Sequence, residues 1–416
     1  MEDLDLIALF IPAWLGLIVL ELVLTRWRGK HWYRLSDTIN SLSLGTIYTT
    51  SSAVTKVIGL ATYLFAYEQA MFTLPENSLW VWLVAFVFYD LCYYWNHRLG
   101  HEINILWASH SVHHQSEDYN LSTGLRQSST SFIFGWIFYI PMALLGFSPL
   151  VFLVVGGVSA IYQFWIHTRH VPKLGLLEKI LVTPSSHRVH HGSNPVYMDK
   201  NYGGVFILWD RLFSSYQEEL DREPVNYGIS KPLRSWNPLW ANLVGYVDLA
   251  KDAGRAGRWQ DKWSIWFRQT GWRPADVAKQ YPRPARSEHY QNYDAKPSVA
   301  VGIYITVQFC LNMAMAFAYL AIADTQSLSF NSMMAAMFLL QLTLIARVLE
   351  NKPWGWFFEN ARLIAILPVT YLCLDLELLS DSGAVLVLSG VLLSMISAAL
   401  VLRTPSVAQQ SASGET

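Results

Sequence analysis

The sequence predicts an all-α integral membrane protein of about nine transmembrane helices, with a histidine-rich cap on the cytosolic side. Three observations support this prediction. Only 15% of the 416 residues are charged and 52% are hydrophobic, whereas soluble domains usually contain about a quarter charged residues. Several apolar runs approach the ~20 residues that a helix needs to cross a bilayer. Most of the histidines follow the ends of such runs.

The first apolar run extends from Leu6 to Thr25 and is long enough to span. It follows an acidic N-terminus, which argues against a cleavable signal peptide. We expect Glu21, near the end of the run, at the depth of the lipid headgroups. Basic and aromatic residues come directly afterwards, as in a cytoplasmic loop with an aromatic belt: Arg26, Trp27, Arg28, Lys30, Trp32, Tyr33 and Arg34.

Two further runs bring the chain out and back. Ser41 to Tyr67 is apolar except for Lys56, and because a charge at the bilayer centre is costly, we expect the span proper to begin near Val57. The loop from Glu68 to Ser78 has no lysine or arginine, as expected outside the cytosol. Leu79 to Trp95 then returns to the cytosolic side, where the first histidines follow.

The next apolar stretch, Ser131 to Trp165, has no charged residue and is interrupted by Pro141 and by Gly146 to Pro149. It predicts a helical hairpin with two short arms. Residues 171–297 are too polar to span, and their tryptophans predict segments that lie on the membrane surface. These tryptophans are Trp236, Trp240, Trp259, Trp263, Trp266 and Trp272.

A second membrane block follows, with basic residues in the loops expected inside and none in those expected outside. Its four predicted spans are Ser298–Ala323, Asn331–Ala346, Leu363–Leu379 and Gly383–Leu402. We therefore divide the chain into a membrane and histidine-rich core (1–215), a cytosolic or interfacial region (216–297), a four-helix membrane block (298–403) and a disordered tail (404–416).

Charge and cysteine content exclude other classes. A net charge of −1 without a basic run gives no sign of nucleic-acid binding. Cys92, Cys310 and Cys373 all lie in apolar segments, which argues against a disulfide framework.

Ten histidines form four clusters, and two of these clusters share the spacing HxxHH. They are His97 and His101; His110, His113 and His114; His167 and His170; and His187, His190 and His191. A single histidine in an apolar segment is usually a hydrogen-bonded core residue. Histidines three or four apart on a helix instead present imidazoles to one point. Because the clusters exceed the four ligands of one zinc site, they predict a dinuclear metal centre.

Many neutral imidazoles with few carboxylates can hold iron and leave positions open for oxygen, so that the C–H bond of a lipid can be attacked; zinc cannot perform this redox step. Asp90 lies seven residues before His97 inside an apolar span, where it either orients a histidine or makes an interhelical contact. Three roles stay open for Glu102: it could accept a hydrogen bond from a metal-binding histidine, contact a cofactor, or be exposed to solvent. Glu117 to Asn120 is predicted to form a solvated or capping turn.

HxxxH and two HxxHH motifs after membrane spans resemble the fatty acid hydroxylase and sterol desaturase superfamily. The stretches that carry the resemblance are 93–129, 162–168, 184–213 and 261–274. Within the superfamily the chain is most similar to the alkylglycerol monooxygenases, over nearly its whole length. The resemblance implies a pterin-dependent enzyme that uses molecular oxygen to hydroxylate the carbon next to a glyceryl ether oxygen and releases a fatty aldehyde and a glycerol derivative.

The resemblance also implies site residues. Eight histidines would hold two iron ions: His97, His101, His110, His113, His114, His187, His190 and His191. His167 matches a superfamily histidine that is a further candidate ligand, and His170 departs from the pattern as an extra ligand or a bystander. Glu102 matches a functional glutamate and is a candidate contact for tetrahydropterin. Glu102 and Asp90 are therefore our candidate catalytic residues.

Two alternatives stay open. Within the superfamily, the enzyme could be a fatty acyl or membrane-lipid hydroxylase, or a desaturase. Outside it, the chain could be a metal transporter or a haem carrier, but a transporter spreads its ligands along a path near the midplane, whereas these histidines share one face. The expected membrane is the bacterial inner membrane or the endoplasmic reticulum, with the site facing the cytosol, and the sequence allows a homodimer.

Overall fold

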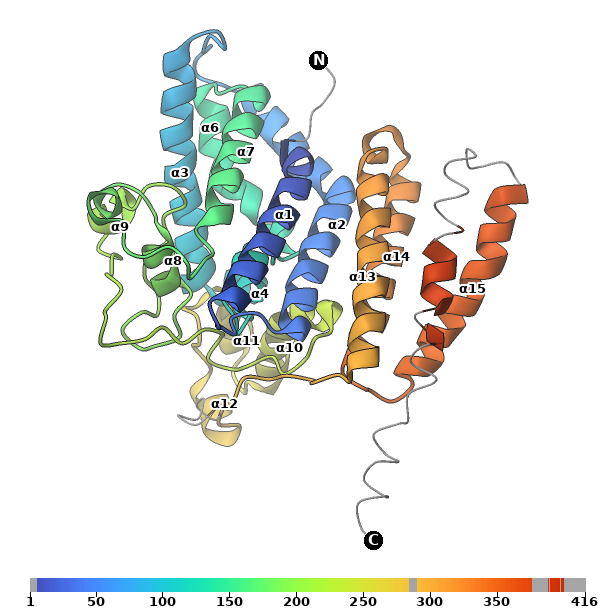
Figure 1. Ribbon diagram of the computed structural model, residues 1–416. Helices are drawn as coiled ribbons and strands as arrows, with labels where there is room; N and C mark the ends of the chain where they lie inside the picture. The colour runs from blue at the N-terminus through green and yellow to red at the C-terminus, as the bar shows by residue number, and fades with distance from the viewer. Residues whose placement is uncertain (1–5, 284–289, 376–387, 389, 397, 400–416) are drawn as a thin grey trace. The chain divides into compact units, whose positions relative to one another are not determined.

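The structure is a computed structural model that describes residues 6–283, 290–375, 388, 390–396 and 398–399. Over these residues the chain is helical, with three isolated β-bridges and no strand (Figure 1), which confirms the all-α class. The chain divides into two compact units. The first comprises Met1–Arg234 and Leu239–Tyr293, and the second Ser235–Pro238 and Asp294–Thr416.

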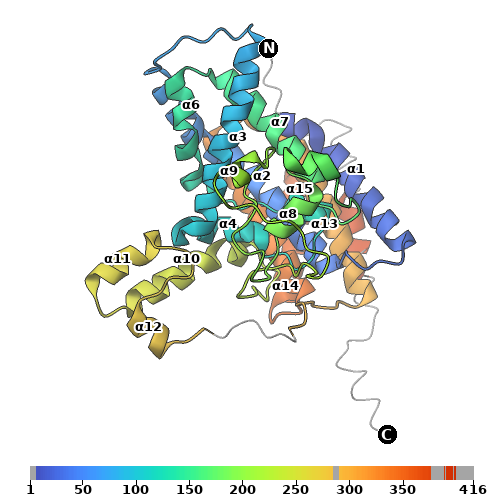
Figure 2. The ribbon, with the colours of Figure 1, turned by 90° about the vertical axis from the view of Figure 1, so that its left-hand side faces the viewer.

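The first unit combines long helices with short ones, and α4, α10, α11 and α12 gather near one end of the long helices (Figures 1 and 2). The long helices are α1 (Leu6–Trp27), α2 (Leu35–Tyr67), α3 (Leu79–Glu102) and α7 (Pro149–Trp165). The shorter ones are α4 (Asn104–His114), α5 (Leu121–Gly124), α6 (Ile140–Leu145), α8 (Pro184–His190), α9 (Leu208–Leu212), α10 (Pro238–Arg255), α11 (Trp259–Phe267) and α12 (Ala275–Gln280). Three 3₁₀ helices, η1 (Ser131–Ile133), η2 (Gly135–Tyr139) and η3 (Gly175–Lys179), complete the unit.

The two halves of α2 have different surroundings. Its first half is buried inside the protein, and the hydroxyl groups there donate to carbonyls four residues earlier, as Thr46 does to Leu42 at 2.9 Å. Beyond that half, large apolar side chains such as Val57 and Phe65 are exposed. The apolar run begins at Ser41, but large exposed apolar side chains appear only in the second half, where the span proper was expected from about Val57.

A sharp break separates α3 from α4 and changes the direction of the chain within the histidine-rich segment. Ile103 adopts an extended conformation between the two helices and pairs with Gln269 in an isolated bridge. The Asn104 N–H donates to the Arg268 carbonyl at 3.0 Å, and the Thr270 N–H donates to the Glu102 carbonyl at 3.0 Å. The segment after α11 therefore fixes the corner between the two histidine-bearing helices.

The predicted hairpin at Ser131 to Trp165 is only half helical. Its second arm is α7, capped by the Ser148 side chain. Its first arm consists of η1, η2 and the short α6, with Pro141 in the first turn, where its missing N–H is tolerated. Gly146 ends α6 with a φ of 96°, and a Cβ there would lie 2.0 Å from the Phe72 carbonyl oxygen, so no other residue fits.

The region after residue 216 forms α10, α11 and α12. On α11, Trp259, Trp263 and Phe267 follow one another at intervals of four residues, and all three are more than half exposed. Such a stripe is typical of a helix that lies on a membrane surface. This agrees with the interfacial segments expected from the sequence.

The second unit contains α13 (Val299–Leu320), η4 (Ala323–Thr325), α14 (Leu328–Leu349) and α15 (Gly355–Asp375). It encloses a buried ion pair, in which Arg362 donates to Glu359 at 2.7 Å and to Gln308 at 2.7 Å. Pairing of this kind lowers the cost of charge among apolar helices. Half of the predicted fourth helix, Gly383–Leu402, is described, and its described residues (388, 390–396 and 398–399) are helical, whereas the predicted tail 404–416 lies wholly outside the described residues.

Three helices of the described residues are long and apolar enough to cross a membrane: Phe10–Trp27, Val299–Leu320 and Leu328–Leu349. They support a membrane protein, but they do not confirm the predicted number of nine spans. Two of the predicted spans do not qualify for simple reasons. The helix α3 ends in polar, histidine-bearing turns, and α7 has only 17 residues.

Candidate metal centre

Nine histidines converge in two groups, and within each group the nitrogens that could bind a metal lie within 4.8 Å of one another. The first group consists of His97, His101, His110, His114 and His190. The second consists of His113, His167, His187 and His191. The sequence predicted a dinuclear centre, and each of the two groups could hold one metal ion.

The HxxHH spacing explains how two helices serve both groups. On α4, His110 and His114 are four residues apart and face the first group, while His113 faces the second. On α8 and its C-terminal cap the roles are exchanged, because His187 and His191 join the second group and His190 joins the first. Each motif therefore gives an i,i+4 pair to one group and a single histidine to the other.

The distances between the inward nitrogens suit metal binding. The Nε2 atom of His110 lies 3.1 Å from that of His97 and 3.1 Å from that of His114. In the second group, the Nε2 atom of His167 lies 3.0 Å from that of His187 and 3.3 Å from that of His113. Two nitrogens that bind one metal at roughly 2.1 Å lie about 3.0 Å apart at a right angle and about 3.4 Å apart at a tetrahedral angle.

Several buried nitrogens point to the same conclusion. The Nε2 atoms of His101, His190 and His191 have no hydrogen-bond partner in the described part of the chain. Burial of an unsatisfied polar atom costs about 1–3 kcal/mol. A metal ion in the first group would use the lone pairs of His101 and His190, and one in the second group would use that of His191, so the donor sets fit metal binding.

Backbone carbonyls fix the other ring nitrogen of four histidines. The Nδ1 atoms of His97, His113 and His167 lie 2.8 Å from the carbonyls of Tyr202, Arg126 and Gln163 respectively, and that of His190 lies 3.0 Å from the Lys200 carbonyl. A carbonyl can only accept, so each Nδ1 carries the proton. The Nε2 lone pair of each ring is therefore free for a metal.

Burial also keeps the imidazoles neutral. Burial lowers the pKa of His113 to about 4. Burial, followed by repulsion from the neighbouring histidines, lowers the pKa of His114 and of His191 well below the usual range. A neutral imidazole offers a lone pair, whereas a protonated one would repel a cation.

Two buried carboxylates hold the loop that supports His97. Asp210 accepts hydrogen bonds from the N–H groups of Tyr202 and Gly203 at 2.7 and 2.8 Å. Asp90 accepts from the N–H groups of Val205 and Phe206 and from the Trp209 indole at 2.8–3.0 Å. The sequence offered two roles for Asp90, orienting a histidine or making an interhelical contact. Two of its hydrogen bonds go to the backbone at residues 205–206 and the third goes to Trp209 on α9, so among the described contacts it reaches no histidine directly. Asp210 was missed because Arg211 follows it directly, and adjacent opposite charges give no sign of a buried support.

Arg126 performs a similar task for the second group and was not predicted. It is 1% exposed, and its guanidinium donates to the Val112 carbonyl and to the Asn40 side chain, both at 2.6 Å, and to the Gln115 side chain at 3.2 Å. Its own carbonyl accepts from His113. Burial lowers the pKa of Arg126 to about 10, so the side chain stays charged and ties α2 to the end of α4.

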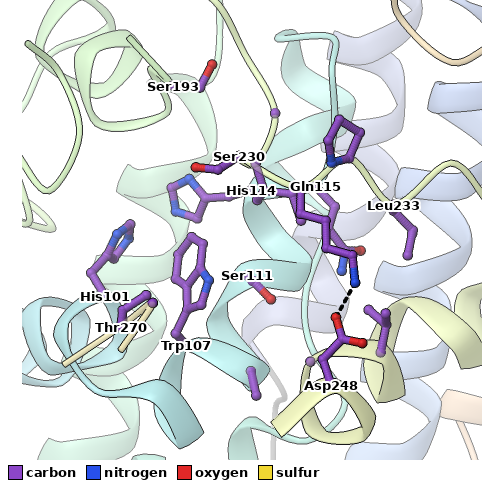
Figure 3. Close-up of a pocket in the computed structure, with 18 of the residues that line it drawn as sticks. His101, Trp107, Ser111, His114, Gln115, Ser193, Ser230, Leu233, Asp248 and Thr270 are labelled. Atoms are coloured by element: carbon purple, nitrogen blue, oxygen red, sulfur yellow. Dashed lines mark hydrogen bonds and ion pairs between the residues drawn. The ribbon is translucent and has the colours of Figure 1, made fainter. Parts of the chain in front are cut away.

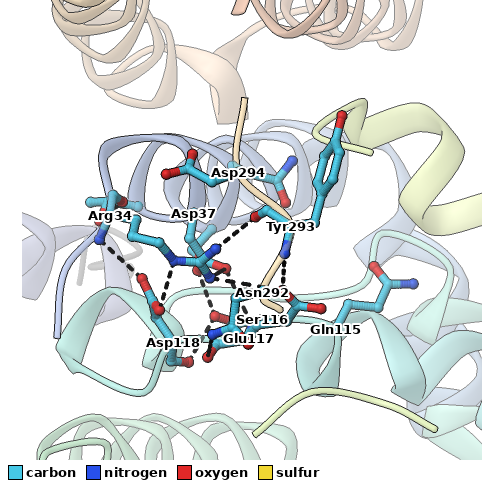
Figure 4. A network of polar contacts seen from close by, with 12 residues as sticks. Arg34, Asp37, Gln115, Ser116, Glu117, Asp118, Asn292, Tyr293 and Asp294 are labelled. Carbon is cyan, nitrogen blue, oxygen red and sulfur yellow. Dashed lines mark hydrogen bonds and ion pairs between the residues drawn. The ribbon is translucent and has the colours of Figure 1, made fainter. Parts of the chain in front are cut away.

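The turn after α4 is buried, contrary to the solvated alternative (Figure 4). Arg34 donates to Asp118 at 3.0 Å and to the Tyr293 carbonyl at 2.6 Å. Glu117 accepts from the Tyr293 N–H at 2.7 Å. The capping alternative is correct for Asn120, whose side chain accepts from the Ser122 N–H at the start of α5.

Two predicted site residues lie apart from both groups. His170 contacts the Thr25 hydroxyl, in the last turn of α1, at 2.8 Å and the Arg28 guanidinium, just after α1, at 3.0 Å. Glu102 follows His101, but its carboxylate is 35% exposed and pairs with Arg98 at 2.9 Å. The structure thus brings together nine of the ten histidines and leaves His170 outside.

A cavity of about 720 Å³ opens onto both groups. His101, His114 and Trp107 lie on one side of it, while Leu233 and Asp248 lie on the other (Figure 3). His190 and His191 also line it, so one cavity reaches both metal positions. Glu102 is not among the lining residues.

Comparison with known proteins identifies the family. The fatty acid hydroxylase family model matches residues 82–215, which contain all nine histidines. Alkylglycerol monooxygenase from Homo sapiens is 38% identical over 368 residues, covering 86% of this chain and 80% of the human protein. The chain belongs to the alkylglycerol monooxygenase family of fatty acid hydroxylases.

Alkylglycerol monooxygenase from Danio rerio is 40% identical over 308 residues, covering 72% of this chain and 68% of that protein. A more distant relative is the ornithine lipid hydroxylase OlsE from Rhizobium tropici, 30% identical over 138 residues, or 33% of this chain and 42% of that protein. No solved structure shows significant similarity. The chain is thus an oxygen-dependent lipid monooxygenase with membrane helices and histidine clusters suited to iron.

Proposed function

We propose that this enzyme hydroxylates alkylglycerols at the carbon next to the ether oxygen, in a diiron centre supplied with electrons by a tetrahydropterin. One oxygen atom enters the C–H bond and the other leaves as water, with two electrons from the pterin and two protons. The resulting hemiacetal then breaks its bond to the glyceryl oxygen and yields a fatty aldehyde and a glycerol derivative. The observation that carries the proposal is the pair of histidine groups at one cavity.

The proposed ligands are the five histidines of the first group and the four of the second, one iron for each group. When bound, iron supplies the activation of oxygen that attack on an alkyl C–H bond needs. The protein keeps the imidazoles neutral by burial and fixes their tautomers with carbonyls. His170 is excluded because Thr25 and Arg28 already occupy its two nitrogens.

The cavity suits an amphiphilic substrate. Its lining includes apolar side chains such as Val244 and Leu249, and also the ion pair between Lys231 and Asp248. An alkyl chain would pack against the apolar side chains, while glycerol hydroxyls would form hydrogen bonds with the ion pair. We infer that the ether carbon lies between them, beside His101 and His114.

We infer that Glu102 contacts the pterin, through hydrogen bonds accepted from the ring's amino group and N–H. In support, its carboxylate is accessible and held by Arg98, next to a proposed iron ligand. Asp90 contributes to catalysis by holding the loop that supports His97. The centre would face the cytosol from the inner membrane of a bacterium or from the endoplasmic reticulum of a eukaryote. The proposal is compatible with a homodimer.

The test is an assay of purified, iron-loaded protein in detergent with a 1-O-alkylglycerol, oxygen and tetrahydropterin. We expect pterin-dependent release of the fatty aldehyde, detected by mass spectrometry, and none from the matched 1-O-acylglycerol. A stable hydroxylated lipid would indicate the membrane-lipid hydroxylase alternative, and a new double bond would indicate a desaturase. Either result would refute ether cleavage.

A further inference from the structure

The segment Asp199 to Tyr202 faces three histidines of the first group with three acceptors. The Lys200 carbonyl lies 3.0 Å from His190 Nδ1, and the Tyr202 carbonyl lies 2.8 Å from His97 Nδ1. The Asp199 carboxylate lies 3.6 Å from His101 Nδ1. Two acceptors are neutral carbonyls and the third is an anion.

We propose that Asp199 is a positioning residue for His101, and that its charge makes the two metal positions unequal. The proposal rests on the metal centre of the proposed function. His101 is the one histidine in the two groups for which the described residues place a carboxylate oxygen within 4.0 Å. Its Nε2 atom is buried without a partner among the described residues. A histidine that binds a metal through one nitrogen usually donates the other N–H to such an acceptor.

The backbone of this segment is built to hold the carboxylate in place. Asp199 and Asn201 have φ angles of 57° and 56°, in the left-handed region that aspartate and asparagine tolerate best among non-glycine residues. The Asn201 side chain donates to the Ser186 and Gln217 carbonyls at 2.9 and 2.7 Å, and Asp210 holds the next two N–H groups. Non-glycine residues persist in this region where surrounding contacts fix them, often at functional sites.

The second group has no matching anion within the described residues. There the outer nitrogens of His113 and His167 meet the carbonyls of Arg126 and Gln163. A carboxylate makes the imidazole a stronger donor than a carbonyl does, which favours the more oxidised metal. The position bound by His101 should therefore be harder to reduce than the other. Because the Asp199 side chain is 60% exposed and lines the cavity, its negative charge stays solvated.

The test compares Asp199→Asn and Asp199→Gly with Asp221→Asn in the full-length protein. Asparagine keeps the backbone and size but removes the charge, and glycine keeps the backbone and removes the carboxylate. Asp221 is a matched control because its side chain is fully exposed and it has no contact with a histidine among the described residues. Iron affinity, Mössbauer spectra and a redox titration are measured on each.

We expect both Asp199 variants to bind one of the two irons about 10- to 100-fold more weakly, with one reduction potential shifted positive and the other unchanged. Added formate should partly restore both properties in Asp199→Gly. The control should match the wild type. An Asp199→Asn protein with unaltered potentials and iron affinity would refute the proposal, as would a wild type that binds no iron. Loss of ether cleavage alone, with the predicted shift present, would refute only the proposed substrate.

Discussion

Replacement of Asp210 by asparagine tests whether the loop after α8 supports only one metal position. The Asp210 carboxylate accepts three hydrogen bonds: one oxygen from the Tyr202 N–H and the Ser215 hydroxyl, the other from the Gly203 N–H. Asparagine keeps one accepting oxygen and turns an NH₂ group toward the remaining donor. A hydrogen bond to a charged group contributes about 1.5–3 kcal/mol, and an unsatisfied buried N–H costs a similar amount.

We therefore expect Asp210→Asn to lower the free energy of unfolding by about 3 kcal/mol. The Tyr202 carbonyl supports His97, so iron in the first group should bind about 10- to 100-fold more weakly. The second group takes its acceptors from Arg126 and Gln163 and should keep its iron. The assays are denaturant unfolding in detergent and iron content after dialysis at fixed free iron.

The comparison variant is Asp90→Asn, since Asp90 holds the N–H groups of Val205 and Phe206, further along the same loop from the Tyr202 carbonyl that supports His97. It should reduce stability with a smaller effect on iron. Equal loss of both irons in Asp210→Asn, or full retention of both despite lower stability, would contradict the reasoning.

Three more predictions concern single properties. His167→Ala should lose activity and iron, whereas His170→Ala should keep both; equal loss, measured by turnover and metal analysis, would bring His170 into the ligand set. Glu102→Ala should retain iron but require far more pterin in a steady-state assay, and loss of its iron would place Glu102 in the metal shell instead. The metal-free protein should lose stability as the pH falls from 7 toward 5, because the folded pKa of His113 is about 4 against about 6.5 unfolded; a thermal midpoint independent of pH would oppose this.

The sequence predicted the convergence of the histidines because helical spacing is a local property. His110, His113 and His114 must share a short stretch of helix, and so must His187, His190 and His191. Their division into a group of five and a group of four depends on how α3, α4 and α8 cross, which spacing does not encode. His167 and His170 look alike in sequence, yet three residues of chain separate a buried contact with His113 from one with Thr25.

The supporting residues were harder to predict for a physical reason. Four of the nine histidines bond to backbone carbonyls, and any residue type provides a carbonyl. Arg126 and Asp210 act through side chains, but Arg126 stands in a polar stretch and Asp210 stands next to Arg211, so neither sequence context distinguishes a buried support from a solvated charge. Hydropathy similarly cannot tell lipid from protein interior, and only the charge of Lys56 moved the expected start of the span from Ser41 to about Val57.

Carboxylates near the two histidine groups bear on the charge of any metal bound there. The nine grouped side chains are all histidines, and neutral imidazoles would leave the charge of the proposed metal cations uncompensated. The carboxylates lie one layer further out: Asp199 faces His101, and Asp210 holds the carbonyl that faces His97. On the other side, buried Glu21 accepts from the Thr168 hydroxyl, next to His167, and from the Leu121 N–H at 2.8 Å. Carboxylates in this outer layer would balance the charge of bound metals without occupying the positions that oxygen and substrate need. Glu21, which the sequence placed at headgroup depth, is buried where α1 meets these two segments and would contribute to this balance.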